Sequence, residues 1–434
     1  MRCSIFLSKI FTLLLLPLIA HAYVIELEGK KEIIWRDFLG VNAHFLWFTP
    51  REYTQQMRHL KALGLEWTRV DVHWDRHELG KGNYRLKELD GLINELKKEK
   101  LKTLMYLVGS AEHATSAPAN SDTPDQYPPK NPLLYADMMA MMVERYPYVN
   151  AWQVWNEPNL PAYWRPHEDA KAYGQLLQTT VQHIRQRKPG TQFVMGGMAY
   201  YSQMPVKGGL MIEELGKLGV AQLKISAAYH PYTHYPEGNE RSKPDYLVHS
   251  KQLNSLIRSV DMPIWATEWG WSSYKGPKEH QDIIGDQGQA DFILRRLALM
   301  TALDYDKIFL FALSDLDSRA SVRDQHYGLL DLQGNPKPAY HALKNFLKAT
   351  GARLVPGVKP KITKAPDDLY SVSWQRKDGK NLWMFWSASG KEVSLDAIND
   401  ASVIDPLAGT TRHVTANQKQ LTLKTKSSLQ ILVW

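Results

Sequence analysis

The sequence contains a single cysteine, Cys3, among its 434 residues. Because Cys3 lies in an N-terminal segment that we expect to be removed, the remaining chain has no thiol. This excludes disulfides, cysteine-ligated zinc and a cysteine nucleophile. The sequence also contains no G-x-G-x-x-G, P-loop or H-E-x-x-H motif. We therefore expect neither a nucleotide cofactor nor a bound metal.

Long hydrophobic runs are also missing. The apolar run over residues 10–20 is shorter than the roughly 18 residues that a membrane-spanning helix needs. Two basic residues precede it, and Ala20-His21-Ala22 has the small-x-small form of a cleavage site. We expect residues 1–22 to be a cleaved export signal, and the mature protein to be periplasmic or secreted. The alternative is an N-terminal anchor that faces the periplasm.

Charge of one sign is not concentrated anywhere in the sequence. The formal net charge is +8, but basic residues alternate with acidic ones, as in "NELKKEKLK". This pattern does not indicate a nucleic-acid partner. A mildly basic exported protein would favour an acidic polymer only weakly.

Strand-like and helix-like segments alternate from the N-terminal region to residue 350. Examples are "WTRVDVHW" before "LKELDGLINELKKEK", and "KIFLFALSD" before "PAYHALKNFLKAT". Eight such units follow one another, which is more than an open doubly wound sheet usually contains. We therefore predict an α/β fold, with a closed (β/α)8 TIM barrel over residues 23–350.

The pattern changes after Thr350 to short strands separated by turn signals, with Asp378-Gly379 at a hairpin turn. We predict a small accessory β-sandwich domain over residues 351–434, completed by "YVIELEG" near the N-terminus. It would either support the barrel by packing or bind carbohydrate, and we favour packing.

Two carboxylates stand at the ends of aromatic-rich strands of this barrel. Glu157 follows strand four in "VWNEP", and Glu268 ends strand seven in "ATEWGW". Catalytic groups of such barrels lie at the C-terminal ends of the strands, where strands four and seven face each other. A protonated and an ionised carboxyl group facing each other are what glycosidic bond cleavage requires, and flat aromatic rings suit sugar faces.

These motifs strongly resemble those of the clan A retaining glycoside hydrolases, with family 39 and its Psl-type biofilm exopolysaccharide hydrolases as the nearest likeness. The resemblance implies that Glu157 is the general acid/base and Glu268 the nucleophile. It also implies that Asn156 binds the substrate 2-hydroxyl and that Arg69 supports the charge of the nucleophile. From "HPY" after strand six, it implies that His230 shapes the site and Tyr232 hydrogen-bonds the nucleophile.

Further substrate contacts are expected from side chains at the same strand ends. His44 and Trp74 match the family less distinctively, and strand eight lacks the tryptophan that many clan members carry. The candidate sugar-stacking or substrate-binding tryptophans are Trp47, Trp74, Trp164, Trp269 and Trp271.

The likeness predicts cleavage of a polysaccharide internally by a double displacement, and we expect the protein to be a monomer. Two other functions stay open: a non-hydrolytic polysaccharide-binding protein of an exopolysaccharide assembly or export system, and a transglycosidase. Two geometric predictions follow. The strand must break at residues 155–158 so that adjacent Asn156 and Glu157 face the same site. The carboxyl groups of Glu157 and Glu268 should lie about 5 to 5.5 Å apart.

Overall fold

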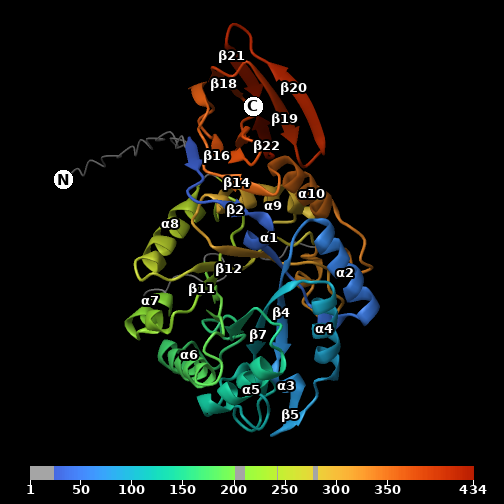
Figure 1. Cartoon of the computed structure of the whole chain (residues 1–434), viewed down its shortest axis with the longest axis vertical. Coiled ribbons are helices and arrows are strands. Elements are labelled where there is room, and N and C mark those ends of the chain that lie inside the picture. Colours follow the sequence, from blue (N-terminus) through green and yellow to red (C-terminus); the bar gives the residue numbers. More distant parts are fainter. Residues whose placement is uncertain (1–23, 201–210, 242, 277–281) are drawn as a thin grey trace, which may run out of the picture.

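The computed structural model describes residues 24–200, 211–241, 243–276 and 282–434. The expected export signal, residues 1–22, lies outside the described residues. Figure 1 shows a barrel of alternating strands and helices and, above it, the C-terminal strands in orange and red. Among the described helices, none combines the length and the apolar character needed to cross a membrane.

The barrel is a ring of parallel strands. β13 pairs with β3, and a bridge from Val194 in β9 to Ser226, just before β11, closes the ring. Since β9 and β10 share the fifth position, the ring has eight positions and the predicted (β/α)8 fold is confirmed. In sheet order the strands are β10 (Met198–Ala199), β11 (Ala227–His230), β12 (Ile264–Trp269), β13 (Lys307–Leu310), β3 (Leu39–Asn42), β4 (Trp67–His73), β7 (Lys102–Val108), β8 (Ala151–Val154) and β9 (Phe193–Met195).

A helix follows each of the eight positions and packs outside the ring, as predicted. Local signals set several helix starts: Thr49 and Glu52 form a capping box at α2, and Asn131 caps α5. The methionine-rich face of α5 is buried against the barrel. The helices are α2 (Pro50–Ala62), α4 (Lys87–Lys98), α5 (Pro132–Arg145), α6 (Ala170–Arg185), α7 (Met211–Lys217), α8 (Asp245–Arg258), α9 (Gly285–Thr301) and α10 (Pro338–Thr350).

Shorter elements lie in the connections of the barrel. They include two helices of one turn, a two-stranded ribbon and four 3-10 turns. Their bounds are α1 (Trp35–Phe38), α3 (Trp74–His77), β5 (Glu78–Gly80), β6 (Asn83–Tyr84), η1 (Phe45–Trp47), η2 (Pro124–Gln126), η3 (Val220–Leu223) and η4 (Asp324–His326).

The C-terminal strands form two antiparallel sheets around a hydrophobic core of their own. The larger sheet contains β2 (Ile33–Ile34), β14 (Arg353–Val355), β16 (Tyr370–Arg376), β17 (Asn381–Trp386), β22 (Gln430–Val433), β19 (Asp400–Asp405) and β20 (Thr410–Thr415) in this order. The smaller sheet contains β15 (Lys361–Lys364), β18 (Glu392–Asp396) and β21 (Gln420–Lys424). β1 (Ile25–Glu28) pairs with β16, as expected for the N-terminal "YVIELEG".

The tryptophans of the larger sheet are used for packing. The indole N–H of Trp374 donates to Thr301 in α9, and that of Trp386 donates to Glu237 of the barrel, and both rings are buried. Trp383 faces the other way, into the core between the two sheets. None of these three rings presents a free face to sugar, which favours the packing role over carbohydrate binding.

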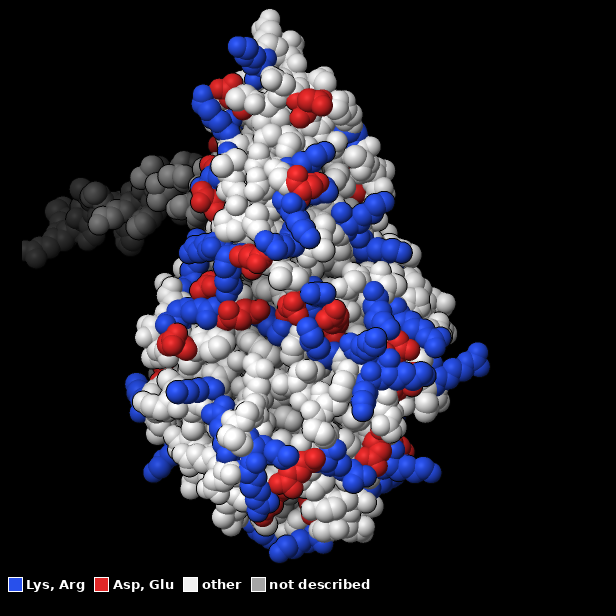
Figure 2. Space-filling view, in the orientation of Figure 1, with Lys and Arg blue, Asp and Glu red and all other residues white. Residues whose placement is uncertain are grey.

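Figure 2 shows that lysine and arginine side chains alternate with acidic ones on the face that it views. They gather in a band at the level where the barrel meets the C-terminal strands. Ion pairs between oppositely charged side chains of the protein include Lys31 with Asp306 and Lys102 with Asp37. The positive charge on this face is therefore mixed with negative charge.

Candidate active site

The backbone carrying Glu157 leaves the barrel sheet abruptly. β8 ends at Val154, and the next residues include Trp155 with φ 72° and Glu157 with φ 40°. This left-handed backbone costs energy for residues with a side chain, so it persists only where surrounding bonds hold it. The amide of Trp155 donates to the carbonyl of Leu107, and that of Glu157 to the carbonyl of Gly197. The predicted break at residues 155–158 is confirmed.

This break turns two consecutive side chains toward the same centre. Oδ1 of Asn156 accepts a hydrogen bond of 2.7 Å from Nη2 of Arg69. Oε1 of Glu157 lies 2.7 Å from Nδ1 of His230. On a regular strand these two side chains would point to opposite faces.

Glu268 stands near the end of β12, where the pairing with β13 shifts register between Ala266 and Trp269. Its Oε1 accepts from Nη1 of Arg69 at 2.6 Å, and its Oε2 accepts from the hydroxyl of Tyr232 at 3.1 Å. Both carboxylate oxygens therefore have a donor, and the bond from the arginine is charge-assisted.

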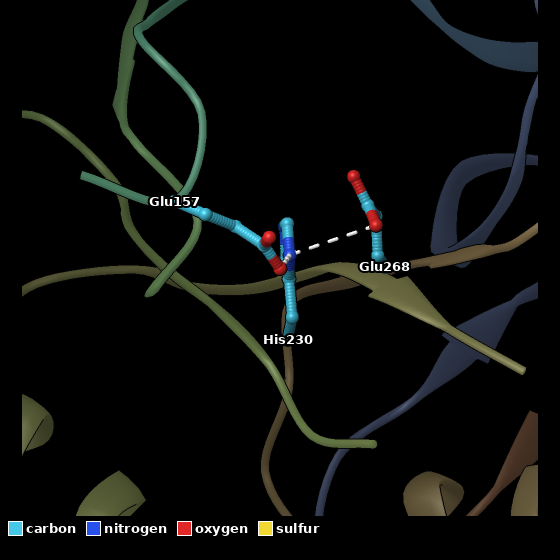
Figure 3. A group of neighbouring side chains, drawn as sticks. All are labelled: Glu157, His230 and Glu268. Carbon is cyan, nitrogen blue, oxygen red and sulfur yellow. Dashed lines mark hydrogen bonds and ion pairs between the residues drawn. The ribbon is translucent and has the colours of Figure 1, made fainter. Parts of the chain in front are cut away.

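The two carboxylates meet around His230. Figure 3 shows Glu157 and Glu268 approaching this ring from opposite sides. One oxygen of Glu157, one oxygen of Glu268 and a ring nitrogen of His230 all lie within 4.8 Å of one another. The strands at positions four and seven thus bring the two acids together, as their place in the sequence predicts.

His230 is fully buried beneath this pair. Burial lowers the pKa of its imidazole to about 3, against the opposing charge of Glu268 and with a smaller contribution from Arg69. Its second nitrogen, Nε2, lies 2.9 Å from the hydroxyl of Thr267. The ring is therefore neutral near pH 7 and has a hydrogen-bond partner on each nitrogen.

Arg69 connects Glu268 and Asn156 to the barrel interior. Besides Glu268 and Asn156, its guanidinium donates to Oε1 of Gln153 at 2.7 Å and to Oδ1 of Asn42 at 2.8 Å, and it lies over the ring of Tyr106. The motifs in the sequence predicted no role for Gln153 or Asn42. The signal was present, because each is a polar side chain on an otherwise apolar, buried strand.

His44 lies at the end of the first barrel strand and contacts Asp71 rather than either acid. Nδ1 of His44 is 3.0 Å from Asp71, whose second oxygen is 3.4 Å from His73. Burial alone would lower the pKa of His44, but the charge and hydrogen bond of Asp71 raise it above its ordinary value. Burial would raise the pKa of Asp71, yet the two histidines hold it well below its usual range.

Four of the tryptophans predicted to contact sugar are buried. Trp74 and Trp269 are 0% exposed, and Trp164 and Trp271 are 2% exposed. The indole of Trp74 donates to Glu78 and that of Trp271 to the carbonyl of Thr233. Their contact with substrate therefore stays a prediction. Trp271 packs against Phe292 of α9, and Trp74 against Tyr135 of α5.

Two other aromatic rings, both beside His44, are partly exposed. Phe311 follows β13 and lies edge-on to His44 and to Tyr327, which in turn contacts Tyr232. Trp47 is partly exposed, but the guanidinium of Arg319 lies 4.6 Å from the centre of its ring. Phe311 therefore provides an aromatic surface on strand eight, where the sequence has no tryptophan.

The group Glu157, His230 and Glu268 has the composition of a metal-ligand set. However, both ring nitrogens of His230 already have hydrogen-bond partners. The guanidinium of Arg69, 2.6 Å from Glu268, would repel a second cation at this position. The arrangement suits an acid pair better than a metal centre.

The cavities that open elsewhere do not reach these residues. One of about 770 Å³ lies between α1, α10 and β14, and one of about 480 Å³ lies between α7 and α8. Neither is lined by Glu157, Glu268 or their hydrogen-bond partners. These two cavities are therefore separate from the acid pair.

Comparison with known proteins identifies the family of the chain. The model of the cellulase family (glycosyl hydrolase family 5) matches residues 27–299, which include both acids. The chain belongs to this family. It is therefore a glycoside hydrolase of clan A type, as the motifs predict. The assignment to family 39 remains a prediction. No curated protein matches the sequence.

Solved structures with the same fold come from related families. A family 39 glycoside hydrolase from Bacteroides cellulosilyticus WH2 has a TM-score of 0.70 at 20% identity, covering 92% of this chain and 82% of its own. A monomeric β-xylosidase from Caulobacter crescentus CB15 has a TM-score of 0.63 at 16% identity, covering 94% and 98%. A family 30 endoxylanase from Clostridium papyrosolvens C71 has a TM-score of 0.60 at 10% identity, covering 94% and 98%. At these identities the likeness concerns the fold.

Proposed function

We propose that this glycoside hydrolase cleaves its substrate with retention of configuration, with Glu157 as general acid/base and Glu268 as nucleophile. The observation that carries the proposal is the close approach of the two acids, with one oxygen of each within 4.8 Å. Retaining enzymes hold their carboxyl groups about 5 to 5.5 Å apart, whereas inverting enzymes leave about 6.5 to 9.5 Å for a water molecule.

The first displacement uses the two acids in different protonation states. Glu268 attacks the anomeric carbon while Glu157 gives its proton to the departing glycosidic oxygen, leaving a glycosyl ester on Glu268 and an ionised Glu157. Arg69 and Tyr232, which donate to the two oxygens of Glu268, hold its carboxylate oriented for attack. The amide group of Asn156, whose oxygen is held by Arg69, is left to donate to the substrate 2-hydroxyl.

The second displacement reverses these roles. Glu157 takes a proton from water, the resulting hydroxide attacks the anomeric carbon, and Glu268 leaves as a carboxylate. Two inversions give net retention. If another sugar replaces water in this step, the same residues perform transglycosylation.

We further propose that the substrate is an exopolysaccharide, cleaved internally, and that the protein acts after export. The motifs resemble those of family 39 and of the Psl-type biofilm polysaccharide hydrolase PslG. The 23 residues between β7 and α5, residues 109–131, provide a polar wall beside the strand ends. The proposal also includes that the protein is a monomer and that it associates with an exopolysaccharide assembly machinery.

Covalent labelling tests the assignment of the nucleophile. The protein is incubated with a panel of 2,4-dinitrophenyl 2-deoxy-2-fluoroglycosides in both anomeric forms, and its peptides are analysed by mass spectrometry. We expect the label on Glu268. A label on Glu157 would overturn the assignment. So would the absence of label from both acids when the protein hydrolyses the glycoside of the same sugar.

Chain-length analysis tests the substrate. Exopolysaccharide from the producing organism is incubated with wild type and with Glu268→Gln, and its length is followed by size exclusion. Rapid shortening by wild type alone is expected for an internally cleaving hydrolase. Products longer than the substrate would indicate transglycosylation, and unchanged length despite binding would indicate a polysaccharide-binding protein.

A further inference from the structure

Two side chains that the proposed mechanism does not use lie behind His230. The hydroxyl of Thr267, the residue before Glu268, is 2.9 Å from Nε2 of His230. Nε2 of the Gln153 amide donates to the same hydroxyl across 3.4 Å. All three side chains are buried, so no bulk water competes for these bonds.

The orientation of the Gln153 amide is determined by its partners. Its oxygen faces Nε of Arg69, which can only donate, at 2.7 Å. Its nitrogen faces the carbonyl of Met195, which can only accept, at 3.0 Å. A flipped amide would lose both bonds, so the amide nitrogen is the group that faces Thr267.

The Thr267 hydroxyl therefore receives one hydrogen bond from Gln153 and has its own hydrogen to donate. Within the described residues, Nε2 of His230 is the only other partner of this hydroxyl. If His230 carried its proton on Nε2, the hydrogen of Thr267 would have no acceptor. A buried donor without an acceptor is costly.

The packing leaves no room to rearrange this contact. A Cβ atom at Gly197 would lie 2.0 Å from Nε2 of His230 and 2.5 Å from the Thr267 hydroxyl. Only glycine fits there, and the carbonyl of Gly197 also binds the amide of Glu157. The backbone that positions Glu157 is thus packed directly against the contact between His230 and Thr267.

The other side of the ring leads to the same protonation. His230 is neutral near pH 7, so it carries a single ring proton. With that proton on Nε2, the lone pair of Nδ1 would face Oε1 of Glu157 at 2.7 Å, which is repulsive unless this oxygen is protonated. With the proton on Nδ1, both nitrogens have complementary partners.

We propose that Thr267, held by Gln153, fixes His230 as the Nδ1–H tautomer, which donates to Oε1 of Glu157. The proton that Glu157 delivers to the glycosidic oxygen is then carried on its other oxygen, Oε2. Thr267 and Gln153 are positioning residues for general acid catalysis, and this consequence rests on the proposed function. Without the Thr267 hydroxyl, His230 can take the other tautomer and hold the acid proton of Glu157 on Oε1.

Nitrogen-15 NMR of protein labelled in its histidines tests the tautomer directly. A two-bond correlation spectrum distinguishes a ring protonated on Nδ1 from one protonated on Nε2, and the spectrum of His230→Gln identifies the His230 signals. We expect Nδ1–H in wild type at pH 7. The Nε2–H tautomer, or a charged ring, would overturn the proposal whether or not the protein cleaves any glycoside.

Substrates with different leaving groups test the catalytic consequence. The leaving group of a 2,4-dinitrophenyl glycoside departs without being protonated. The leaving group of a phenyl glycoside needs a proton from the general acid. For whichever sugar wild type hydrolyses, Thr267→Val should reduce kcat/KM for the phenyl glycoside by about tenfold or more, and for the dinitrophenyl glycoside by less than about threefold. An equal loss on both substrates would indicate a merely structural effect and contradict the proposal.

Two variants serve as controls. Thr267→Ser keeps the hydroxyl and should restore the phenyl glycoside activity. Thr103→Val removes another buried barrel hydroxyl, which contacts Thr68 and not His230, and should leave the ratio of the two substrates unchanged. If Thr103→Val changed that ratio as much as Thr267→Val does, the proposal would be wrong.

The pH profile gives an independent measurement. Among the residues that the structure describes, the titratable and charged groups around His230 and Glu157 include Glu268, Arg69, Tyr232 and Tyr163. None of these groups changes in Thr267→Val. The Nε2–H tautomer of His230, which this variant allows, stabilises only the protonated form of Glu157. The alkaline limb of kcat/KM should therefore move to higher pH, and a shift to lower pH would contradict the proposal. If wild type hydrolysed no glycoside while His230 showed Nδ1–H, the proposed function would fail and the tautomer assignment would stand.

Discussion

Arg69 donates from Nη1 to Oε1 of Glu268 across 2.6 Å, between strands at the second and seventh positions of the barrel. Both side chains are buried. Removing one partner of a buried ion pair leaves the other charge without compensation, which is more costly than replacing both.

Arg69→Met should therefore lower the free energy of unfolding by about 3 to 5 kcal/mol. Urea unfolding, followed by tryptophan fluorescence at pH 7, measures this loss. Glu268→Gln added to Arg69→Met should recover part of it, because the uncompensated charge is then gone. Strict additivity of the two changes would contradict the pairing.

Arg296→Met is a suitable control for the comparison of Arg69→Met with and without Glu268→Gln. Arg296 is also a buried arginine of the barrel, but its guanidinium donates to the carbonyls of Pro231 and Pro236 rather than to an acid of the site. It should destabilise the protein without any coupling to Glu268→Gln.

Azide distinguishes the roles of the two acids. Glu157→Ala should form the glycosyl ester from a dinitrophenyl glycoside but hydrolyse it slowly, because no base activates water. Added azide should restore turnover and give a glycosyl azide of the same configuration as the substrate. Glu268→Ala with azide should give the opposite configuration. Exchanged outcomes, identified by proton NMR of the products, would reverse the assignment.

Phe311 should act as a sugar platform in place of the buried tryptophans. Stacking on an aromatic ring is worth about 0.5 to 1.5 kcal/mol, so Phe311→Ala should raise KM about two- to tenfold with a smaller change in kcat. Trp47→Ala is the matched variant. If only Trp47→Ala raised KM, the platform would be Trp47 instead.

Lys307 gives the stability of the protein a pH dependence unrelated to catalysis. It is buried at the start of β13, where its ammonium lies 4.0 Å from the centre of the Trp67 ring. Burial lowers the pKa of Lys307 from 10.5 to about 7, with Lys102 lowering it further and Asp37 and Asp306 opposing. Between these values the unfolded chain binds the extra proton, so stability rises with pH from about 7 upward.

The slope that Lys307 contributes is at most about 1.4 kcal/mol per pH unit. Urea unfolding of wild type and Lys307→Met at pH 7, 8 and 9 measures it, and the variant should have the smaller slope. Equal slopes would mean that the contact with the Trp67 ring keeps the ammonium charged in the folded protein.

Much of the fold follows from local patterns in the sequence. The alternation of strands and helices predicts the eight barrel positions because each unit is a local segment with its own periodicity and caps. The break after Val154 also follows from the sequence, since adjacent Asn156 and Glu157 can share a site only if the strand distorts. The register shift beside Glu268 has no comparable local signal.

The direction of the tryptophan rings could not be predicted in this way. Trp74, Trp269 and Trp271 stand beside residues of the site, and proximity in sequence suggested contact with sugar. Whether a ring faces the barrel mouth or the layer under the helices depends on strand twist and on neighbours distant in sequence, such as Phe292 beside Trp271.

The sequence by itself determined the order of elements, the two acids and the aromatic strand ends, because these depend on residue type and spacing. The tertiary structure decided which side chains support the acids. Gln153, Thr267 and Gly197 belong to three different strands or their ends, and only closure of the ring places them around His230. Hydrogen bonds act over about 3 Å, so their partners are fixed by the packing of distant segments rather than by any local pattern.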